Sequence, residues 1–371
     1  MTEAAIRQNK EKPKRGVWIL NSNRWNSAIT EYSLQLARAL SSKYEVFYTA
    51  KIGTPAAARA AKMGLKVYPV DAFKVGELDK LRYIKERAKP YFVFTVGGQD
   101  TSMVSFLKKE KHETRIRFRG DHLKKGILRN ILFKYSHKSF DGFLTPCELL
   151  ANQLKPITTK KIKSIDLGID SDAFSLNGYC QENQTTKKCL IFGRLDPVKG
   201  HREFLKIVAS YKSKFPKTKL KVQIFGREEN LSKNEIIDVA SALGVEDMIE
   251  FQIGTIENVG TVMANAHAGV ISSLDSELIC RVAHEFLLSG TPVFVSGAGA
   301  TEEVLKEKEF GASFKGLSDF EAADKLHELL SVDSSLEQKK ELSNKAQKYF
   351  SLQSMSCEIE LFLEDLSIFG V

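Results

Sequence analysis

The stretch that decides the fold is CLIFGRLDPVKG, Cys189 to Gly200, in which a short apolar run leads into a loop with two glycines and two cations. A helical pattern, HREFLKIVASYKSKF, begins directly after it. A strand, a loop and a helix in this order predict a ligand site at the carboxyl end of a strand in an open α/β sheet. Gly193 and Gly200 permit tight turns, while Arg194, Lys199 and the N–H groups at the helix start suit a diphosphate. The spacing alone fits a solvated turn with two surface cations equally well.

Short β-rich runs alternate with helical patterns on both sides of this stretch. We predict strands over residues 17–21, 45–50, 65–70, 91–96, 114–118, 142–146, 188–193, 219–226, 248–252, 267–273 and 291–296. Such alternation predicts parallel sheets with helices on both faces. The expected fold class is therefore α/β, with two doubly wound, Rossmann-like domains in tandem.

The length of 371 residues also favours two domains, because one hydrophobic core rarely grows so large. We predict five parts, namely a flexible basic tail over 1–15, a first domain over 16–176, a linker over 177–188, a second domain over 189–350 and a C-terminal helix over 351–371. This last helix could cross back to the first domain.

The composition is that of a soluble globular protein, with 43% hydrophobic and 27% charged residues. No apolar run is long enough to span a bilayer, and no apolar segment follows the polar start MTEAAIRQNKEKPKRG as the core of a secretory signal would. The five cysteines lack C-x-x-C spacing, which argues against a zinc site or a disulfide framework. We therefore expect a cytoplasmic protein.

The net charge of +9 is divided unevenly along the chain. Residues 1–163 contain 33 basic and 14 acidic residues, a net charge of +19, whereas the rest contains 22 basic and 32 acidic residues, a net charge of −10. The basic half is expected to face an anionic partner, such as a membrane surface, a phosphorylated acceptor or nucleic acid. Its cations are spread over many elements and are not interleaved with aromatic residues, which argues against nucleic acid.

Neither half has a G-x-G-x-x-G motif after its first strand, nor a G-x-x-x-x-G-K-[ST] loop, so NAD-type dehydrogenases and P-loop ATPases are disfavoured. A second informative stretch, SSLDSELICRVAHEFLLSGTPVFVSGAGATEEVL, covers residues 272–305. In it Glu277 lies in a predicted strand-to-helix loop, and Glu285 lies eight positions later on the helix. Without further context these are a loop acid and a solvated helix residue.

Four motifs in order resemble the retaining GT-B glycosyltransferases of family 4, also called glycosyl transferases group 1. They are SIDLGIDSDAF (164–174), FGRLDPVKG, the run from Glu277 into HEFLLSGTPVFVS, and the turn GATEEV, and the resemblance covers residues 140–315. It implies a GT-B fold, in which the two domains face each other across a cleft. It further implies transfer of a sugar, with retention, from a nucleotide diphosphate sugar bound by the second domain to an acceptor on the side of the first.

The resemblance also implies roles for residues at matching positions. Arg194 and Lys199 would bind the donor diphosphate and neutralise charge on the leaving nucleotide, Glu277 would hold the transferred sugar, and Glu285 would bind the ribose. The backbone N–H groups of Leu278 and Ile279 would cradle phosphate. Glu303 occupies the place of an acid near the cleft, or is a helix N-terminal charge. No metal ion or other cofactor is expected, because the cations stand in for Mg²⁺.

The first domain departs from the pattern of this family. The loop after its first strand reads NSNRWNSA and has no glycine; Asn23 and Arg24 could reach a sugar or phosphate, or could belong to a surface loop. Where relatives place a histidine, this chain has Arg119, a glycine, Asp121 and His122. Any of these three could touch the donor sugar or the acceptor, although an Asp beside a His is often structural.

The acceptor implied by the resemblance is a cell-envelope glycan, either of lipopolysaccharide type or lipid-linked. Residues 122–142 form an amphipathic pattern with Leu128, Ile131, Leu132 and Tyr135 on one stripe and cations around it. Such a helix could dock on an anionic membrane, placing the enzyme peripherally on its inner face, or could simply pack on its own sheet.

Four other functions remain open from the sequence. A sugar phosphorylase or a nucleotide-sugar epimerase of the same fold would use the same phosphate cradle. A nucleic-acid-binding module would use the basic half. A catalytically silent relative would bind sugars only, although the presence of both cations and both glutamates argues against it.

Overall fold

The computed structural model describes residues 14–123, 137–174, 176–180, 185–254, 257–275, 277–332 and 334–368. The chain divides into two compact units. The first contains Met1–Phe118, Lys125–Phe143 and Glu364–Val371, and the second contains Arg119–Lys124 and Leu144–Leu363. The amphipathic stripe of the predicted helix over 122–142 lies outside the described residues.

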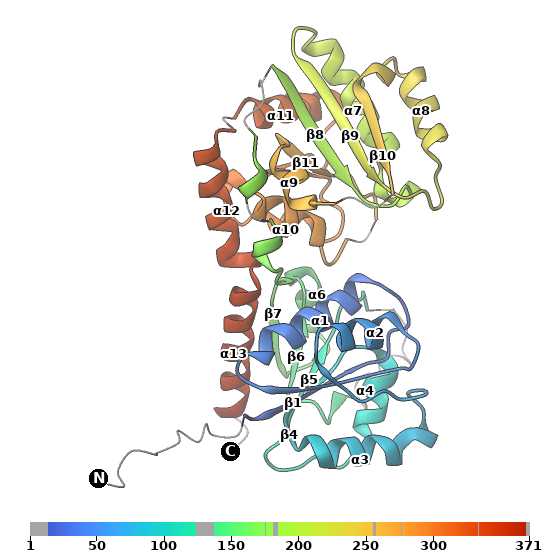
Figure 1. The fold of residues 1–371 in the computed structure, drawn as a ribbon, viewed down its shortest axis with the longest axis vertical. Helices are drawn as coiled ribbons and strands as arrows, with labels where there is room; N and C mark the ends of the chain where they lie inside the picture. The colour runs from blue at the N-terminus through green and yellow to red at the C-terminus, as the bar shows by residue number, and fades with distance from the viewer. Residues whose placement is uncertain are drawn as a thin grey trace, which may run out of the picture. The chain divides into compact units, whose positions relative to one another are not determined.

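The first sheet has seven strands in the order β3-β2-β1-β4-β5-β6-β7 (Figure 1). The pairings of β1 with β2 and β4, of β2 with β3 and of β4 with β5 are parallel. The strands are β1 (Gly16–Asn21), β2 (Glu45–Ala50), β3 (Lys66–Val67), β4 (Pro90–Thr95), β5 (Thr114–Phe118), β6 (Gly142–Thr145) and β7 (Lys161–Ser164). The helices between them are α1 (Ala28–Ser41), α2 (Pro55–Lys62), α3 (Leu78–Ala88), α4 (Gly98–Ser105) and α6 (Glu148–Leu154).

Strand β1 shows why this sheet is parallel and covered on both faces. All six of its residues are buried, and Trp18 and Leu20 have no exposed surface. A strand buried on both faces reads as a continuous apolar run rather than an alternating one. The indole N–H of Trp18 donates to the hydroxyl of Thr49, 2.9 Å away on β2, so its one polar group is satisfied inside the core.

The second sheet has six strands in the order β10-β9-β8-β11-β12-β13, and every neighbouring pair is parallel. The strands are β8 (Thr186–Phe192), β9 (Lys219–Gly226), β10 (Ile249–Ile253), β11 (Ala268–Ile271), β12 (Val293–Val295) and β13 (Gly311–Ser313). Figure 1 shows β8, β9 and β10 side by side. The helices are α7 (His201–Lys214), α8 (Lys233–Ala242), α9 (Val259–Ala264), α10 (Arg281–Leu288), α11 (Asp319–Ser331), α12 (Leu336–Phe350) and α13 (Leu352–Ile368).

The core of this second unit is built by β8, β9 and the helices packed on them. Phe204, Leu205 and Val208 of α7 are fully buried in one core cluster with Val222 of β9, as the apolar spacing of the helix predicts. The loop at the start of α7 is therefore held at a fixed place on the sheet.

The predicted α/β class with two parallel sheets is confirmed. Two strands were missed, β7 and β13, because their sequences KIKS and GAS carry no apolar run and their residues are only half-buried. The strand predicted over 65–70 is wrong in length, since only Lys66–Val67 pairs regularly and Val70 makes a single bridge to Lys51. Strand β8 begins at Thr186, inside the segment predicted as a linker, because Thr186 pairs with Lys219 of β9.

Candidate active site

The loop over Gly193–Gly200 is fixed by hydrogen bonds to both of its flanks. The N–H of Gly193 donates to the carbonyl of Phe225 (2.9 Å) and the N–H of Leu195 to the carbonyl of Arg227 (2.7 Å). Asp196 is buried, and its carboxylate accepts from the N–H of Val198 (3.0 Å). These contacts give the loop one defined shape before any ligand arrives.

Asp196 is also the group that ties this loop to the neighbouring one. The side-chain amide of Asn230 donates to its Oδ2 at 2.8 Å, and this bond is the main cause that lowers the pKa of the carboxyl group. Asp196 therefore remains an anion inside a loop that carries two cations.

Gly200 closes the loop against the end of strand β11. Its φ is +67°, a conformation that favours glycine, and a Cβ atom at this position would lie only 1.9 Å from the carbonyl oxygen of Ser272. The hydroxyl of Ser272 in turn donates to the carbonyl of Lys199 at 2.8 Å. The loop after β8 and the loop after β11 thus touch through backbone atoms.

This contact brings Lys199 and Glu277 together. The Nζ atom of Lys199 lies 2.6 Å from Oε2 of Glu277, and the hydroxyl of Ser273 donates to the same oxygen at 2.9 Å. The side chains of Lys199 and Glu277 are 29% and 21% exposed, so the pair is sheltered but within reach of a ligand. It lies where the adjacent strands β8 and β11 end, the edge at which ligands bind in open α/β sheets.

Arg194 is held by acids of the same edge. Its Nη1 donates to Oε1 of Glu229 at 2.9 Å, and its Nη2 lies 3.6 Å from Oδ2 of Asp196. The side chain is 42% exposed. Both predicted phosphate-binding cations are thus ion-paired in this structure, and a diphosphate would replace carboxylates as their partner.

The residues after Glu277 continue the site along the chain. Among the described residues, no hydrogen bond engages the N–H groups of Leu278 and Ile279, so both remain able to bind an anion. Glu285 lies on α10 with its side chain 9% exposed, and its Oε1 accepts from Nε of Arg281 at 2.6 Å.

Glu303 makes a different contact from the other predicted acids. Its two carboxylate oxygens accept from the N–H groups of Glu148 (2.6 Å) and Leu149 (2.8 Å), at the start of α6. A carboxylate at this place satisfies backbone donors that the helix itself leaves unpaired.

The loop after β1, which lacks glycine, is built from side-chain hydrogen bonds instead. Oδ1 of Asn21 accepts from the N–H of Asn23 at 2.8 Å, and the side-chain amide of Asn23 donates to the hydroxyl of Ser27 at 2.6 Å. The amide of the predicted ligand residue Asn23 is thus used within the loop. Arg24, next to it, is exposed.

The carboxylate of Asp100 holds this loop in place through hydrogen bonds, a role that the sequence did not predict. It is fully buried, and its Oδ2 accepts from the N–H groups of Ser22 (3.1 Å), Val96 (3.1 Å) and Gly97 (2.8 Å). Burial raises the pKa of this carboxyl group, while the N–H donors oppose the shift. The loops after β1 and β4 are joined through this one side chain.

The segment after β5 is also ordered by local bonds. Nε of Arg119 donates to the carbonyl of Asp121 and its Nη2 to the carbonyl of His122, both at 3.1 Å. Nδ1 of His122 lies 3.0 Å from the side-chain amide of Gln153. Arg119 therefore shapes the turn, whereas Asp121 and His122 are exposed.

His201 is a candidate residue of this site that was not predicted from the sequence. It is 1% exposed, neither of its ring nitrogens has a hydrogen-bond partner among the described residues, and burial lowers its pKa to about 4. It lines a small cavity of about 30 Å³ together with Lys199, Ser273 and Glu277. A buried polar group without a partner is uncommon in proteins. The signal in the sequence was its place directly after Lys199 and Gly200.

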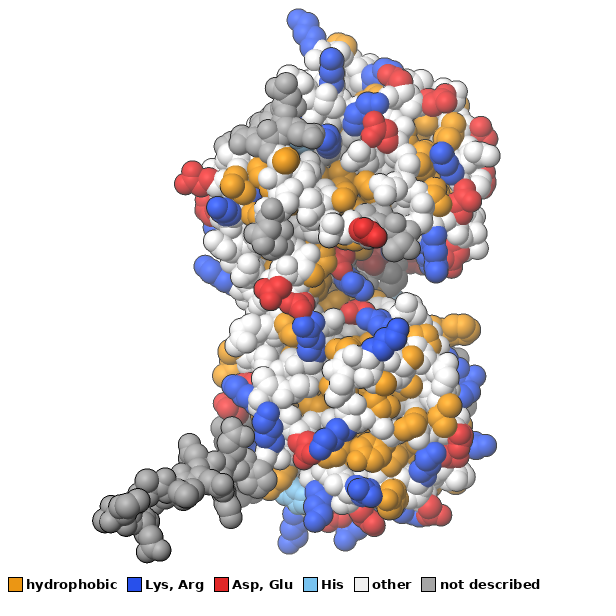
Figure 2. Space-filling model, in the orientation of Figure 1, with side chains coloured by type: hydrophobic (Ala, Val, Ile, Leu, Met, Phe, Trp, Pro, Cys, Tyr) orange, Lys and Arg blue, Asp and Glu red, His pale blue; other side chains and the backbone are white. Residues whose placement is uncertain are grey.

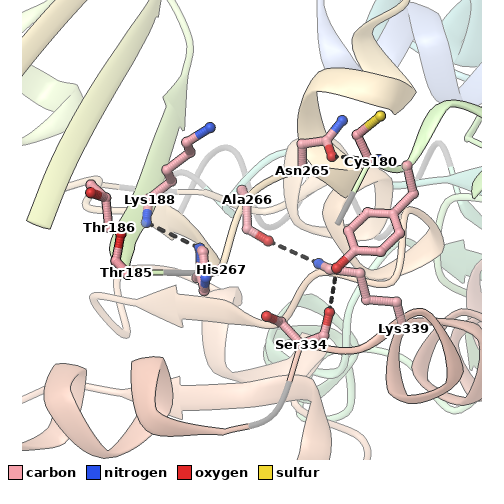
Figure 3. A pocket seen from close by; sticks show the side chains of 10 residues that line it. Cys180, Thr185, Thr186, Lys188, Asn265, Ala266, His267, Ser334 and Lys339 are labelled. Atoms are coloured by element: carbon pink, nitrogen blue, oxygen red, sulfur yellow. Dashed lines mark hydrogen bonds between the residues drawn. The ribbon is translucent and has the colours of Figure 1, made fainter. Parts of the chain in front are cut away.

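A larger cavity, of about 420 Å³, includes the start of β8 (Figure 3). Two cations, Lys188 and Lys339, line it. Lys339 is 3% exposed, and burial lowers its pKa to about 7. Its Nζ donates to the carbonyl of Ala266 (2.8 Å) and to the hydroxyl of Thr291 (3.0 Å), the first of which is drawn in Figure 3. Because the protein itself satisfies this ammonium group, we assign the candidate active site to the opposite, carboxyl end of the strands.

Two other features are absent from the described residues. No group of three or more His, Cys, Asp or Glu side chains there is arranged to hold a metal ion. In the same part of the chain, no helix has the length and apolar character needed to cross a membrane.

Comparison with known proteins agrees with this geometry. Residues 180–349 match the family model described as Glycosyl transferases group 1. A search of curated protein sequences found no match.

Solved structures of glycosyltransferases have the same fold. A glycosyltransferase from Rickettsia africae ESF-5 has a TM-score of 0.77 at 12% identity, covering 95% of this chain and 98% of that one. Anabaena Alr3699/HepE in complex with UDP has a TM-score of 0.76 at 13% identity, covering 94% and 100%. The lipopolysaccharide outer core galactosyltransferase WaaB has a TM-score of 0.67 at 12% identity, covering 95% and 99%. The chain is therefore a glycosyltransferase of GT-B fold, whose residues 180–349 match the glycosyl transferases group 1 family.

Proposed function

We propose that this glycosyltransferase moves a sugar from a nucleotide diphosphate sugar to its acceptor with retention of the anomeric configuration. The observation that carries the proposal is the meeting of Lys199, Ser273 and Glu277 at the carboxyl ends of β8 and β11. A cation and a carboxylate at one edge suit a ligand that carries both phosphate groups and sugar hydroxyls.

Each group of the site then has one task. Arg194 and Lys199 neutralise the charge that grows on the leaving nucleoside diphosphate, and the N–H groups of Leu278 and Ile279 hold phosphate oxygens. Glu277 accepts hydrogen bonds from the transferred sugar. Separately, Glu285 accepts them from the ribose.

The reaction class asks for no nucleophile from the protein. In a front-face displacement, the donor phosphate itself helps to remove the proton from the acceptor hydroxyl. The chain supplies positioning and fixed charge, and the two cations act without a metal ion.

We also propose residues of the first sheet's loops for binding the donor sugar or the acceptor. Asn23, Arg24, Arg119, Asp121 and His122 are the candidate residues for the donor sugar or the acceptor. Glu303 is kept as a further candidate, although its contact with α6 favours a structural role.

We propose a cell-envelope glycan, of lipopolysaccharide type or lipid-linked, as the acceptor, and a cytoplasmic enzyme at the inner face of the membrane. The name of the similar galactosyltransferase WaaB supports this acceptor class, and the net charge of +19 on residues 1–163 supports an anionic partner. The structures of Anabaena Alr3699/HepE with UDP and with UDP-glucose support UDP as the first nucleotide to test.

The experiment that tests the donor site is a calorimetric titration with UDP, GDP and ADP. The wild type is expected to bind one of them, and the double variant Arg194→Ala/Lys199→Ala is expected to lose this binding. Lys212→Ala serves as a control, since it removes an exposed cation that pairs with Asp247. If no nucleotide binds, or if the double variant binds like the wild type, the proposed donor site is wrong.

Three further measurements separate the proposed reaction from its alternatives. Nuclear magnetic resonance gives the anomeric configuration of the product. We expect the same configuration as in the donor, and an inverted product would contradict the mechanism. Release of nucleoside diphosphate only after an acceptor is added excludes an epimerase. Tight, steeply salt-dependent binding of oligonucleotides would instead support a nucleic-acid-binding module.

A further inference from the structure

Three loops of the first unit each carry a cation followed directly by an exposed apolar residue. The apolar side chains are 75%, 51% and 65% exposed for Trp25, Ile52 and Val75. The three pairs, which we call the dyads, are Arg24–Trp25, Lys51–Ile52 and Lys74–Val75. Single exposed apolar residues are common on protein surfaces, but the same pair repeated in three loops asks for an explanation.

The fold makes these loops neighbours. They follow β1, β2 and β3, which are adjacent in the sheet and parallel, so their carboxyl ends share one edge. The N–H of Ile52 donates to the carbonyl of Val70 at 2.9 Å, which joins the second loop to the third. Nη1 of Arg59, in the last turn of α2, donates to Oδ1 of Asn26 at 3.0 Å. The first loop is thereby joined to the second.

Trp25 is exposed by the construction of its loop. Its N–H donates to Oδ1 of Asn23 at 3.2 Å, and its carbonyl accepts from the hydroxyl of Thr30 at 2.8 Å. The loop is thus ordered by the hydrogen bonds of Asn23 while the largest apolar side chain in it faces water.

Charge favours a lipid membrane as the partner of the dyads. Each dyad brings its own cation, and the nearest acid after Arg24, Glu31, is buried and ion-paired with Arg59 at 2.5 Å. Two acids lie beside the third dyad, namely Glu77 and Asp71, of which Asp71 is 68% exposed and lies 3.8 Å from Lys80. On the face of the first unit seen in Figure 2, Lys and Arg side chains lie among hydrophobic ones. Peripheral membrane surfaces combine three kinds of side chain. Tryptophan lies at the membrane–water interface, aliphatic groups enter the boundary of the acyl chains, and cations bind anionic headgroups.

We propose that the three dyads dock this enzyme on a bilayer that contains anionic lipids. The inference rests on the proposed function for its purpose, since a lipid-linked acceptor would be presented at that surface. It is independent of the amphipathic pattern over 122–142. A sugar-binding surface would use Trp25 equally well, but the aliphatic Ile52 and Val75 have no use in recognising a sugar.

The two tryptophans of the chain give a direct test. Trp18 has no exposed surface, whereas Trp25 is 75% exposed, so a change in emission on docking comes from Trp25. The full chain is mixed with vesicles of phosphatidylcholine alone and with vesicles that also contain phosphatidylglycerol, each with and without brominated acyl chains. We expect a blue shift and bromine quenching with the anionic vesicles only, and neither change in Trp25→Phe.

Variants then test the other dyads. Lys51→Gln and Lys74→Gln are each expected to weaken partitioning onto anionic vesicles about fivefold, and Ile52→Ser and Val75→Ser to weaken it by a similar factor. The control is Phe320→Ser, which removes an apolar side chain of similar exposure, 57%, from the other unit, and it is expected to partition like the wild type.

Three outcomes would overturn the proposal. One is an unchanged Trp25 emission with anionic vesicles, and another is equal partitioning of the dyad variants and the wild type. The third is a Trp25 response to a soluble glycan but not to vesicles, which would make the surface a sugar site. Nucleotide binding is measured without vesicles, so docking and the proposed transferase reaction can fail separately.

Discussion

Lys199 and Glu277 form an ion pair of 2.6 Å although 78 positions separate them in the chain. The pair exists because β8 and β11 are neighbours in the second sheet, and because Gly200 lets the loop after β8 lie against the carbonyl of Ser272. Each partner holds the other in place, and Ser273 fixes the carboxylate from a second side. A ligand that binds here meets groups whose positions are already set.

We expect Lys199→Ala and Glu277→Gln each to lower kcat/KM by about 10²-fold or more, as the loss of about 3 kcal/mol of transition-state stabilisation requires. Because the two residues act as a unit, the double variant should lose less than the product of the two single effects. Steady-state kinetics of the wild type and the three variants, with a nucleotide sugar that the wild type uses as donor, measures these effects. Activity within about threefold of the wild type in both single variants would exclude the proposed roles.

We expect Gly200→Ala to abolish nucleotide binding and to destabilise the second unit. The new Cβ would meet the Ser272 carbonyl at 1.9 Å, in addition to the strain of a left-handed φ. Gly244 is the matched control, since its φ is +68° and no atom lies within 4 Å of the added Cβ.

Gly244→Ala should therefore cost only the strain, about 1–2 kcal/mol, and leave nucleotide binding intact. Urea unfolding and calorimetry of both variants make the comparison. Equal behaviour of the two would mean that the close approach at Gly200 does not shape the site.

We expect the stability of the protein to fall as the pH drops below 6.5. Burial lowers the pKa of His201 to about 4 and that of His284 to about 3, so both stay neutral in the fold while the unfolded chain takes up protons. As the pH falls, the loss of stability begins near the pKa of the unfolded chain, 6.5, and continues until the pH reaches the pKa of the folded protein. At pH 5, each histidine should account for about 2 kcal/mol of it.

The measurement is urea unfolding at pH 7 and pH 5 for the wild type, His201→Phe and His284→Phe. Each variant should lose less stability between the two pH values than the wild type does. If His201→Phe keeps the full loss, this side chain is charged or exposed in the fold, against its described burial.

We expect Glu303→Ala to destabilise the chain by about 1 kcal/mol, because it leaves the first N–H groups of α6 without their carboxylate. Glu302→Ala is the control, since its exposed ion pair with Lys315 should contribute no more than about 0.5 kcal/mol. Urea unfolding of both variants decides the point. Similar small losses in both would leave Glu303 available for a ligand.

The sequence by itself determined the class of the fold and the place of the loop GRLDPVKG on the sheet. Continuous apolar runs such as GVWILN of β1 are typical of strands buried on both faces, and the helical patterns between them predict parallel pairing. A loop with two cations after such a run, as in GRLDPVKG, must lie at the carboxyl edge, where ligands bind. These inferences depend only on local periodicity, so they can be made without knowing which segments contact each other in the folded chain.

The tertiary structure alone decided which groups meet and which are already engaged. The order of the strands sets β11 beside β8 and so selects Glu277 as the partner of Lys199. The burial of Asp100 and His201, and the use of Glu303 at α6, depend on contacts between segments far apart in the chain. Such contacts leave no periodic signal, because burial and hydrogen bonding are properties of the packed chain and not of the residue sequence.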